Sequence, residues 1–456
     1  MSAALYPQQQ RTGAARVLPL LGWLRGYNRA VLRHDLSAGI TVAVMLVPQS
    51  MAYAALAGLP PVTGLYAAVV PLVVYALLGS SGALAVGPVA ITALMTGAAL
   101  VPLADGDPTR YAALAGLLAL LVGAIQVLLG VLRLGVLVNF MSHSVLSGFT
   151  SAAAIVIAAS QLKDLLGLDA ERAETFPRII GSLWQSAGTA HGLTILVSVV
   201  SVTGLVLLRR YAPRLPGALL VVAAVTAASA ALALGGRGVK ILAEVPNGLP
   251  AATLPAVSGS DIRALLPAAV AIALVAYLEG IAVAKALAAK SRQQVSPNGE
   301  LIAVGAANAA AGLFQAFPVA GGFSRSAVNF SAGARTPVAT LITAAAVAVT
   351  ALLLTPAFYH LPNAVLAAIV VVAVLGLVDR RGAVNAWRAS LADGLTVAVT
   401  FLVTLGFGVE PGLAAGIGFS LGVFLWRSAR RRTGEPGRVP DARTGPPART
   451  TITQRE

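Results

Sequence analysis

The sequence has no cysteine, and charged residues occupy only 11% of its 456 positions. Without thiols the chain forms no disulfide, no cysteine-ligated metal site and no thiolate nucleophile. Hydrophobic residues make up 57% of the chain, which is more than a soluble protein of this length could bury in one core. The sequence therefore predicts an all-α polytopic membrane protein that uses the lipid bilayer as its main solvent.

Motifs for catalysis and metal binding are missing as well. The sequence has neither a G-x-x-x-x-G-K-S/T phosphate loop nor a G-x-S-x-G nucleophile elbow. Its four histidines are far apart, with no carboxylate or second histidine at ligand spacing: His34, His143, His191 and His360. We therefore expect no enzyme activity, no catalytic residue, no metal and no cofactor.

Acidic residues are scarce, since 17 Asp and Glu oppose 32 Lys and Arg and leave a formal net charge of +15. Such an excess can indicate a nucleic-acid partner, but here the basic residues are scattered among short loops and the two ends of the chain. The positive-inside rule of membrane proteins explains them, so we expect no nucleic-acid partner. The first 35 residues hold five arginines and no apolar run that ends at a cleavage site, so we expect no signal peptide.

Apolar stretches of about 17 to 25 residues predict membrane-spanning helices. Two further segments, 88–102 and 323–333, are too short to cross a bilayer alone, and each follows a short glycine-rich stretch. We expect these two to be half-helices preceded by short extended stretches. The full spans are expected at 38–57, 62–79, 111–133, 143–166, 191–210, 216–235, 264–289, 297–317, 336–356, 362–378, 388–408 and 410–427.

The basic residues fall in alternate loops, which predicts an inner (plasma) membrane location with both termini in the cytoplasm. The fourteen segments divide into two groups of seven, and each half-helix is third in its group. Because seven is odd, the second group inserts upside down, as in the inverted repeats of many transporters. The inner loops carry Arg133, then Arg209, Arg210 and Arg214, then Lys290 and Arg292, Arg335, then Arg380, Arg381 and Arg388, and finally Arg427 and residues 430–432.

The two half-helices predict an anion site. A helix that begins inside the membrane presents unpaired backbone N–H groups and the positive end of its dipole. We expect Pro88 to lie in the first turn of one half-helix, and the two N-termini to face each other. The ion would then be surrounded by Val89, Ala90, Phe323 and Ser324, beside Arg325. An arginine at this depth is costly, so anion binding is its default role, although snorkelling or a structural pair with Glu279 are alternatives.

Two further polar positions lie in apolar spans. Gln49 follows Pro48 in the first span, with Tyr53 one turn later on the same face. Together they indicate a helix that lines a polar cavity, whereas a packing kink with a helix-to-helix hydrogen bond is the alternative. Glu279 lies deep in the span 264–289, where burial disfavours its charged form, so it could take up and release a coupling proton. A structural partnership with Arg325 or Lys285 is the alternative.

Four long motifs resemble the SulP family of anion transporters, which includes sulfate, dicarboxylate, bicarbonate and chloride carriers. They are VPQSMAYAALAGLPPVTGLYAAVVP from Val47, GPVAITALM from Gly87, YLEGIAVAKALAAK from Tyr277 and GGFSRSAVNFSAGARTP from Gly321. The resemblance covers roughly residues 30–428. It implies seven plus seven inverted segments over 36–428, with a core domain (segments 1–4 and 8–11) and a gate domain (segments 5–7 and 12–14).

The resemblance also implies roles for single residues. The substrate would lie between the third and tenth segments, lined by Gln49, Tyr53, Val89, Ser324 and Arg325, and Glu279 matches an acidic position linked to proton coupling in some members. Sodium-coupled members carry a hydroxyl where this chain has Val283, which argues against sodium.

Most members continue into a cytoplasmic STAS domain. Here residues 437–440 are similar to the usual linker, but the stretch 429–456 is polar and rich in Pro, Gly and Arg. We expect a disordered basic tail and no STAS domain, which leaves a homodimer open but without that domain to support it.

Three functions are compatible with these residues. The first is proton-coupled symport of a small anion by an elevator-like movement of core against gate. The second is an uncoupled anion exchanger or anion channel, in which Arg325 attracts the ion and Glu279 is structural. The third is a membrane scaffold without transport, which the polar residues at mid-membrane disfavour. Backbone N–H groups and one arginine suit sulfate, a dicarboxylate, bicarbonate and chloride equally.

Overall fold

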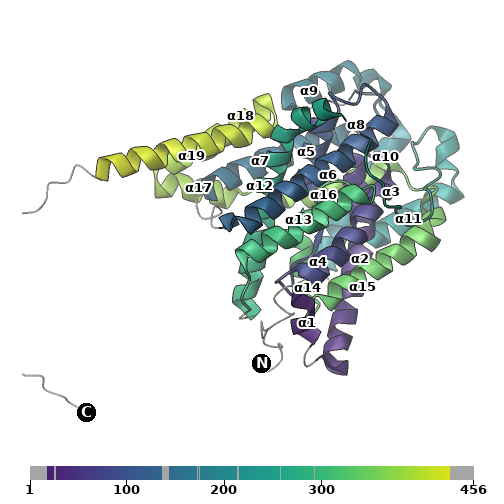
Figure 1. Cartoon of the computed structure of the whole chain (residues 1–456). Coiled ribbons are helices and arrows are strands. Elements are labelled where there is room, and N and C mark those ends of the chain that lie inside the picture. Colours follow the sequence, from purple (N-terminus) through teal and green to yellow (C-terminus); the bar gives the residue numbers. More distant parts are fainter. Residues whose placement is uncertain are drawn as a thin grey trace, which may run out of the picture.

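The computed structural model describes residues 18–24, 27–135, 143–171, 173, 175–212, 215–256, 258–291 and 293–431. These residues form a bundle of helices, and Figure 1 shows α19 (Val409–Arg431) extending from one edge of it. Most of the expected N-terminal segment 1–35, and the expected tail beyond residue 431, lie outside the described residues.

Within the described residues, eight helical stretches are long and apolar enough to cross a bilayer, so the chain is a multi-pass membrane protein. They are α2 (Arg29–Ala57), α3 with α4 (Pro61–Ala67 and Val70–Leu78), α6 (Pro108–Val131), α7 with α8 (His143–Ser160 and Leu162–Leu166), α10 (Gly192–Tyr211), α12 (Gly259–Ser291), α15 (Val338–Val349) continued to Phe358, and α16 with α17 (Asn363–Val374 and Arg380–Ala389). Shorter helices are α1 (Pro19–Leu24), α5 (Ala90–Leu100), α9 (Phe176–Gln185), α11 (Gly217–Ala231), α13 (Pro297–Leu313), α14 (Phe323–Ser331) and α18 (Leu391–Phe407).

The sequence sets where several helices begin. The side chain of Asn28 accepts hydrogen bonds from the N–H groups of Ala30 and Val31, both at 3.0 Å, and so caps α2. The helix therefore begins at Arg29 rather than at the predicted position 38. The prediction followed hydropathy, which the charged residues of the first turns lower, whereas the Asn28 cap determines where the helix itself starts. Ser296 caps α13 in the same way, through the N–H of Gly299.

The two short helices with extended lead-ins that the sequence predicts are present. β1 (Val86–Gly87) leads into α5 and β2 (Ala320–Gly321) leads into α14. The two strands pair antiparallel, with Val86 opposite Gly321 and Gly87 opposite Ala320. α5 has 11 residues and α14 has nine, so neither could cross a bilayer alone. Pro88 lies before the N-cap of α5 and outside its first turn, contrary to expectation.

Small residues bring α6 and α13 close together. A Cβ atom on Gly123 would lie 2.5 Å from the backbone nitrogen of Ala309, and one on Gly305 would lie 2.7 Å from the backbone nitrogen of Val127. Only glycine fits at such contacts, which are typical of helix pairs in membranes. The two helices are therefore packed backbone against backbone, and α13 contacts the chain just before β2.

Asn308 connects the packed pair α6 and α13 to the chain just before β2. Its Oδ1 atom accepts a hydrogen bond from the N–H of Val319 at 2.7 Å, and its Nδ2 atom donates to the carbonyl of Val319 at 3.0 Å. Nδ2 also donates to Gln126 of α6, whose own amide donates to the carbonyl of Ala273 in α12. Three helices thus position the backbone that enters the strand crossing, which is the antiparallel pair of β1 and β2.

Candidate functional site

The N-termini of α5 and α14 face the strand crossing from its two ends. Thr92, in the first turn of α5, donates a hydrogen bond to the carbonyl of Pro318, just before β2. Gly322, the N-cap of α14, donates to the carbonyl of Ala85, just before β1. Neither N-cap residue, Val89 or Gly322, caps its helix with a side chain. Both helices therefore direct first-turn N–H groups and the positive end of their dipole at the crossing.

Arg325 of α14 lies between these two N-termini. It is only 3% exposed, and its Nη1 atom donates a hydrogen bond to the carbonyl of Pro88, immediately before α5. Its buried Nε and Nη2 atoms donate to none of the described residues. A buried guanidinium with two free donors is costly, and an anion is the partner that would satisfy both its charge and its geometry.

Two glycines make room for the guanidinium. A Cβ atom on Gly322 would lie 3.0 Å from Nη2 of Arg325, and one on Gly87 would lie 3.3 Å from the same atom. Gly87 also has a φ of +150°, a backbone conformation that side chains disfavour. Sequence reasoning recognised a glycine-rich lead-in but missed this packing role, because nothing in the sequence places Arg325 over both strands.

Glu279 of α12 is half-buried close to this site. Among the described residues no hydrogen bond reaches its buried Oε2 atom, and no ion pair within 4 Å joins it to Arg325 or Lys285. Glu279 and Arg325 nevertheless interact electrostatically, and the buried hydroxyl of Tyr53 interacts with both. The structure thus brings Tyr53, Glu279 and Arg325 together without the direct ion pair considered as an alternative, and Gln49 lies half-buried one turn before Tyr53.

The four residues at the helix starts differ in exposure. Val89 and Ala90 are buried at the start of α5, whereas Phe323 is 59% exposed at the start of α14 and Ser324 is exposed too. The side chains are therefore buried at the start of α5 and exposed at the start of α14.

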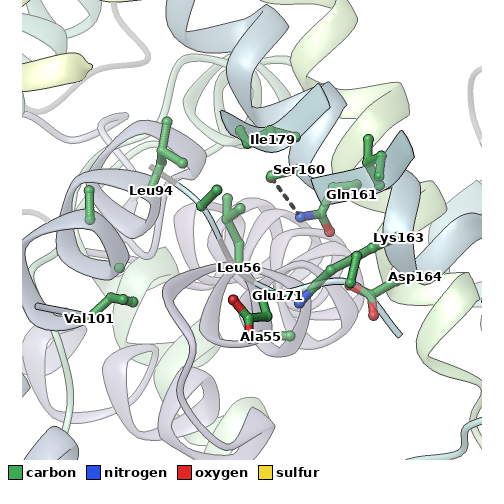
Figure 2. A pocket seen from close by; sticks show the side chains of 15 residues that line it. Ala55, Leu56, Leu94, Val101, Ser160, Gln161, Lys163, Asp164, Glu171 and Ile179 are labelled. Carbon is green, nitrogen blue, oxygen red and sulfur yellow. Dashed lines mark hydrogen bonds between the residues drawn. The ribbon is translucent and has the colours of Figure 1, made fainter. Parts of the chain in front are cut away.

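A cavity lies away from Arg325, at the C-terminal ends of α2 and α5 (Figure 2). Its wall from α2 and α5 is apolar and includes Leu56, Leu94 and Val101, while Lys163 and Asp164 of α8 lie on the facing wall. The rest of its lining is Ala55, Gly97, Ala98, Ser160, Gln161, Ala170, Glu171, Ala173, Ile179 and Leu183. The cavity thus has an apolar surface from α2 and α5, opposite a surface to which α7 and α8 contribute polar side chains and α9 contributes the apolar Ile179 and Leu183.

The chain is similar in sequence to known transport proteins. Residues 32–400 match the sulfate permease family. Sulfate transporter 4.1, chloroplastic, of Arabidopsis thaliana is 41% identical over 438 residues, which cover 93% of this chain and 63% of that protein. A probable sulfate transporter of Mycobacterium tuberculosis is 40% identical over 425 residues, which cover 92% of this chain and 76% of that protein. The chain thus spans less than two thirds of the length of the plant relative.

A solved structure has the same fold. Murine Solute Carrier 26 family member A9, an anion transporter in the inward-facing state, superposes with a TM-score of 0.86 at 26% identity, over 92% of this chain and 74% of that one. Its similarity extends the sequence match to the arrangement of helices. On the sequence match over most of its length, the chain belongs to the sulfate permease family.

Proposed function

We propose that this protein is a secondary active transporter of a small anion, with sulfate the first candidate because relatives at about 40% identity carry that name. The observation that carries the proposal is Arg325, buried between the N-termini of α5 and α14 with two donors that no described residue accepts. One guanidinium fork and two sets of helix N–H groups together match the oxygens of a sulfate, a dicarboxylate or bicarbonate. Chloride would use the charge without the fork.

The proposal includes an inverted-repeat arrangement of the membrane segments. The fourteen segments insert as two inverted groups of seven, with α5 and α14 the third of each group and both termini in the cytoplasm. Segments 1–4 and 8–11 form the core that carries the anion, and segments 5–7 and 12–14 form the gate. The alternating arginine-rich loops support this orientation, as does the antiparallel pairing of β1 and β2, which relates the two short helices by approximate twofold symmetry.

Core and gate move against each other in an elevator-like manner. With this orientation, the exposed Phe323 and Ser324 face the cytoplasmic side, in agreement with the likeness to an inward-facing transporter. The cavity in Figure 2 then lies at the outer end, between core helices α2 and α5 and gate helices α7 to α9. It forms the outer part of the path that opens when the core moves outward.

Glu279 carries the coupling proton. It lies near Arg325 without an ion pair, so an arriving anion and a proton on Glu279 stabilise each other through the same local field. Uptake of radiolabelled sulfate into proteoliposomes, with and without an inward proton gradient, tests the proposal. Accumulation that depends on the gradient supports symport, while flux without accumulation supports the alternative of an uncoupled exchanger or channel.

A further inference from the structure

Glu300, in the first turn of α13, binds the backbone of the chain that leads into β1. It is 1% exposed. Its Oε1 atom accepts hydrogen bonds from the N–H of Ser80 at 2.8 Å, the hydroxyl of Ser80 at 2.6 Å and the N–H of Ser81 at 3.1 Å. Its Oε2 atom accepts one from the hydroxyl of Tyr75 at 2.9 Å. Ser80 and Ser81 begin the stretch that leads into β1 and α5.

Asp35 of α2 binds the chain after the other short helix in the same way. It is fully buried. Its Oδ1 atom accepts hydrogen bonds from the N–H groups of Arg335 at 2.7 Å and Thr336 at 3.2 Å. Its Oδ2 atom accepts from the hydroxyls of Thr336 at 2.5 Å and Tyr27 at 3.2 Å. Arg335 and Thr336 lie in the connection that follows α14.

Each of the two carboxylates holds a segment that belongs to the other half of the chain. Asp35 lies in the first half and holds the segment attached to α14, while Glu300 lies in the second half and holds the segment attached to α5. Both bind main-chain N–H groups, so they fix backbone position rather than the orientation of one side chain. A carboxylate suits this task because it only accepts hydrogen bonds and has two oxygens to do so.

Further hydrogen bonds continue the connection toward the anion site. Ser326 of α14 accepts a hydrogen bond from the N–H of Ala85 at 2.9 Å, and Asn329 of α14 donates to the carbonyl of Ala83 at 3.1 Å. The stretch that Glu300 holds is therefore tied directly to the helix that carries Arg325. The two carboxylates and this link make α5, α14 and both strands one connected unit.

We infer that Asp35 and Glu300 are positioning residues that clamp the two short helices to the rest of the core, so that the anion site keeps its shape as the core moves; the inference rests on the proposed function. Removing either clamp frees one segment and lowers the preorganisation of the N–H groups at the crossing. Anion affinity then falls even in molecules that remain folded.

Hydrogen exchange and transport kinetics of the full chain test this clamp with Glu300→Gln and Asp35→Asn. We expect Glu300→Gln to speed amide exchange in 80–87 by at least about tenfold and to leave 334–338 unchanged, and Asp35→Asn to do the reverse. Each variant should raise the KM for sulfate about tenfold with a smaller change in limiting rate. Asp261→Asn is the matched control, because Asp261 accepts from Ser258 and pairs with Arg110, neither of which belongs to a short helix.

The inference is overturned if exchange in both segments matches wild type, or if folded variants keep the wild-type KM. Should an amide variant fail to fold, Tyr75→Phe and Thr336→Val each remove one donor hydroxyl and leave the carboxylate in place, and the same segment-specific pattern is expected at smaller size. A wild-type chain that transports no anion would reject the proposed function, whereas the exchange measurement would still decide the clamp by itself.

Discussion

A Cβ atom on Gly321 would lie 2.8 Å from the Cα atom of Gly280, so β2 and α12 touch backbone to backbone. This contact places Glu279, the neighbour of Gly280, next to the strand crossing, while Arg325 lies over the same strands. The acid and the guanidinium are thus held near each other by main-chain packing rather than by a salt bridge.

The first prediction concerns this contact. Gly321→Ala should lower the free energy of unfolding by about 1–3 kcal/mol, because neither backbone can yield without moving a strand or α12. Thermal unfolding in detergent measures the change. Gly280→Ala is the control, since its Cβ atom would lie 3.6 Å from the nearest atom, an ordinary contact. Equal destabilisation by both substitutions would contradict the packing described.

The second prediction concerns the room left for the guanidinium. Gly322→Ala should weaken sulfate binding about tenfold, because its methyl group pushes Nη2 of Arg325 away from the crossing. The fold should stay stable, since the displaced atoms end a flexible side chain. Titration of sulfate into purified protein measures the affinity, with Gly181→Ala, where a Cβ atom meets nothing within 4 Å, as control. Unchanged affinity in Gly322→Ala would show that the position of Nη2 is irrelevant to binding.

Much of this site could be predicted from sequence because its parts stand out against an apolar background. Glu279 is a charged residue inside an apolar span, Arg325 lies in a segment too short to cross a bilayer, and the start of α14 at Phe323 follows directly from Gly321 and Gly322. Pro88 shows the limit of such reasoning. It breaks the chain as expected, but its carbonyl accepts from Arg325, so the helix begins only at Ala90.

The parts that sequence reasoning missed depend on contacts across the whole chain. Asp35 and Glu300 each look like an ordinary charged residue near a helix start, and their hydrogen-bond partners lie 301 and 220 residues away. Asn308 is an amide in an apolar run, which indicates a buried hydrogen-bonding role. Its partner Val319 could not be predicted, because the strand pairing determines where Val319 lies. The pairing of β1 with β2 sets each strand glycine opposite an apolar residue far away in the sequence, and no local pattern indicates it.

The third prediction concerns coupling. Glu279→Gln should abolish accumulation of sulfate driven by an inward proton gradient but retain downhill exchange, because the amide cannot take up a proton while it preserves the shape of the side chain. Proteoliposome uptake at a series of external pH values measures this, and the wild-type rate should rise as external pH falls whereas the variant rate stays flat. Gradient-driven accumulation by Glu279→Gln would assign the proton to another group.

The fourth prediction concerns the outer cavity. The sequence has no cysteine, so Val101→Cys introduces a single thiol. A membrane-impermeant thiol reagent added outside should reduce uptake to less than about half, since its bulk obstructs closure of the cavity during core movement. Gly188→Cys is the control, because this position has open space around it. Modification of Val101→Cys without loss of uptake would place the cavity outside the transport path.

The most direct test of the account is the affinity of the purified protein for sulfate before and after Arg325→Gln, measured by calorimetric titration with the melting temperature recorded alongside. We expect the substitution to weaken binding by at least about tenfold, because it removes a charge-assisted donor fork, while the protein remains folded. Arg325→Lys should recover only part of the affinity, since it restores the charge without the fork. Wild-type affinity in folded Arg325→Gln would contradict an anion site between α5 and α14.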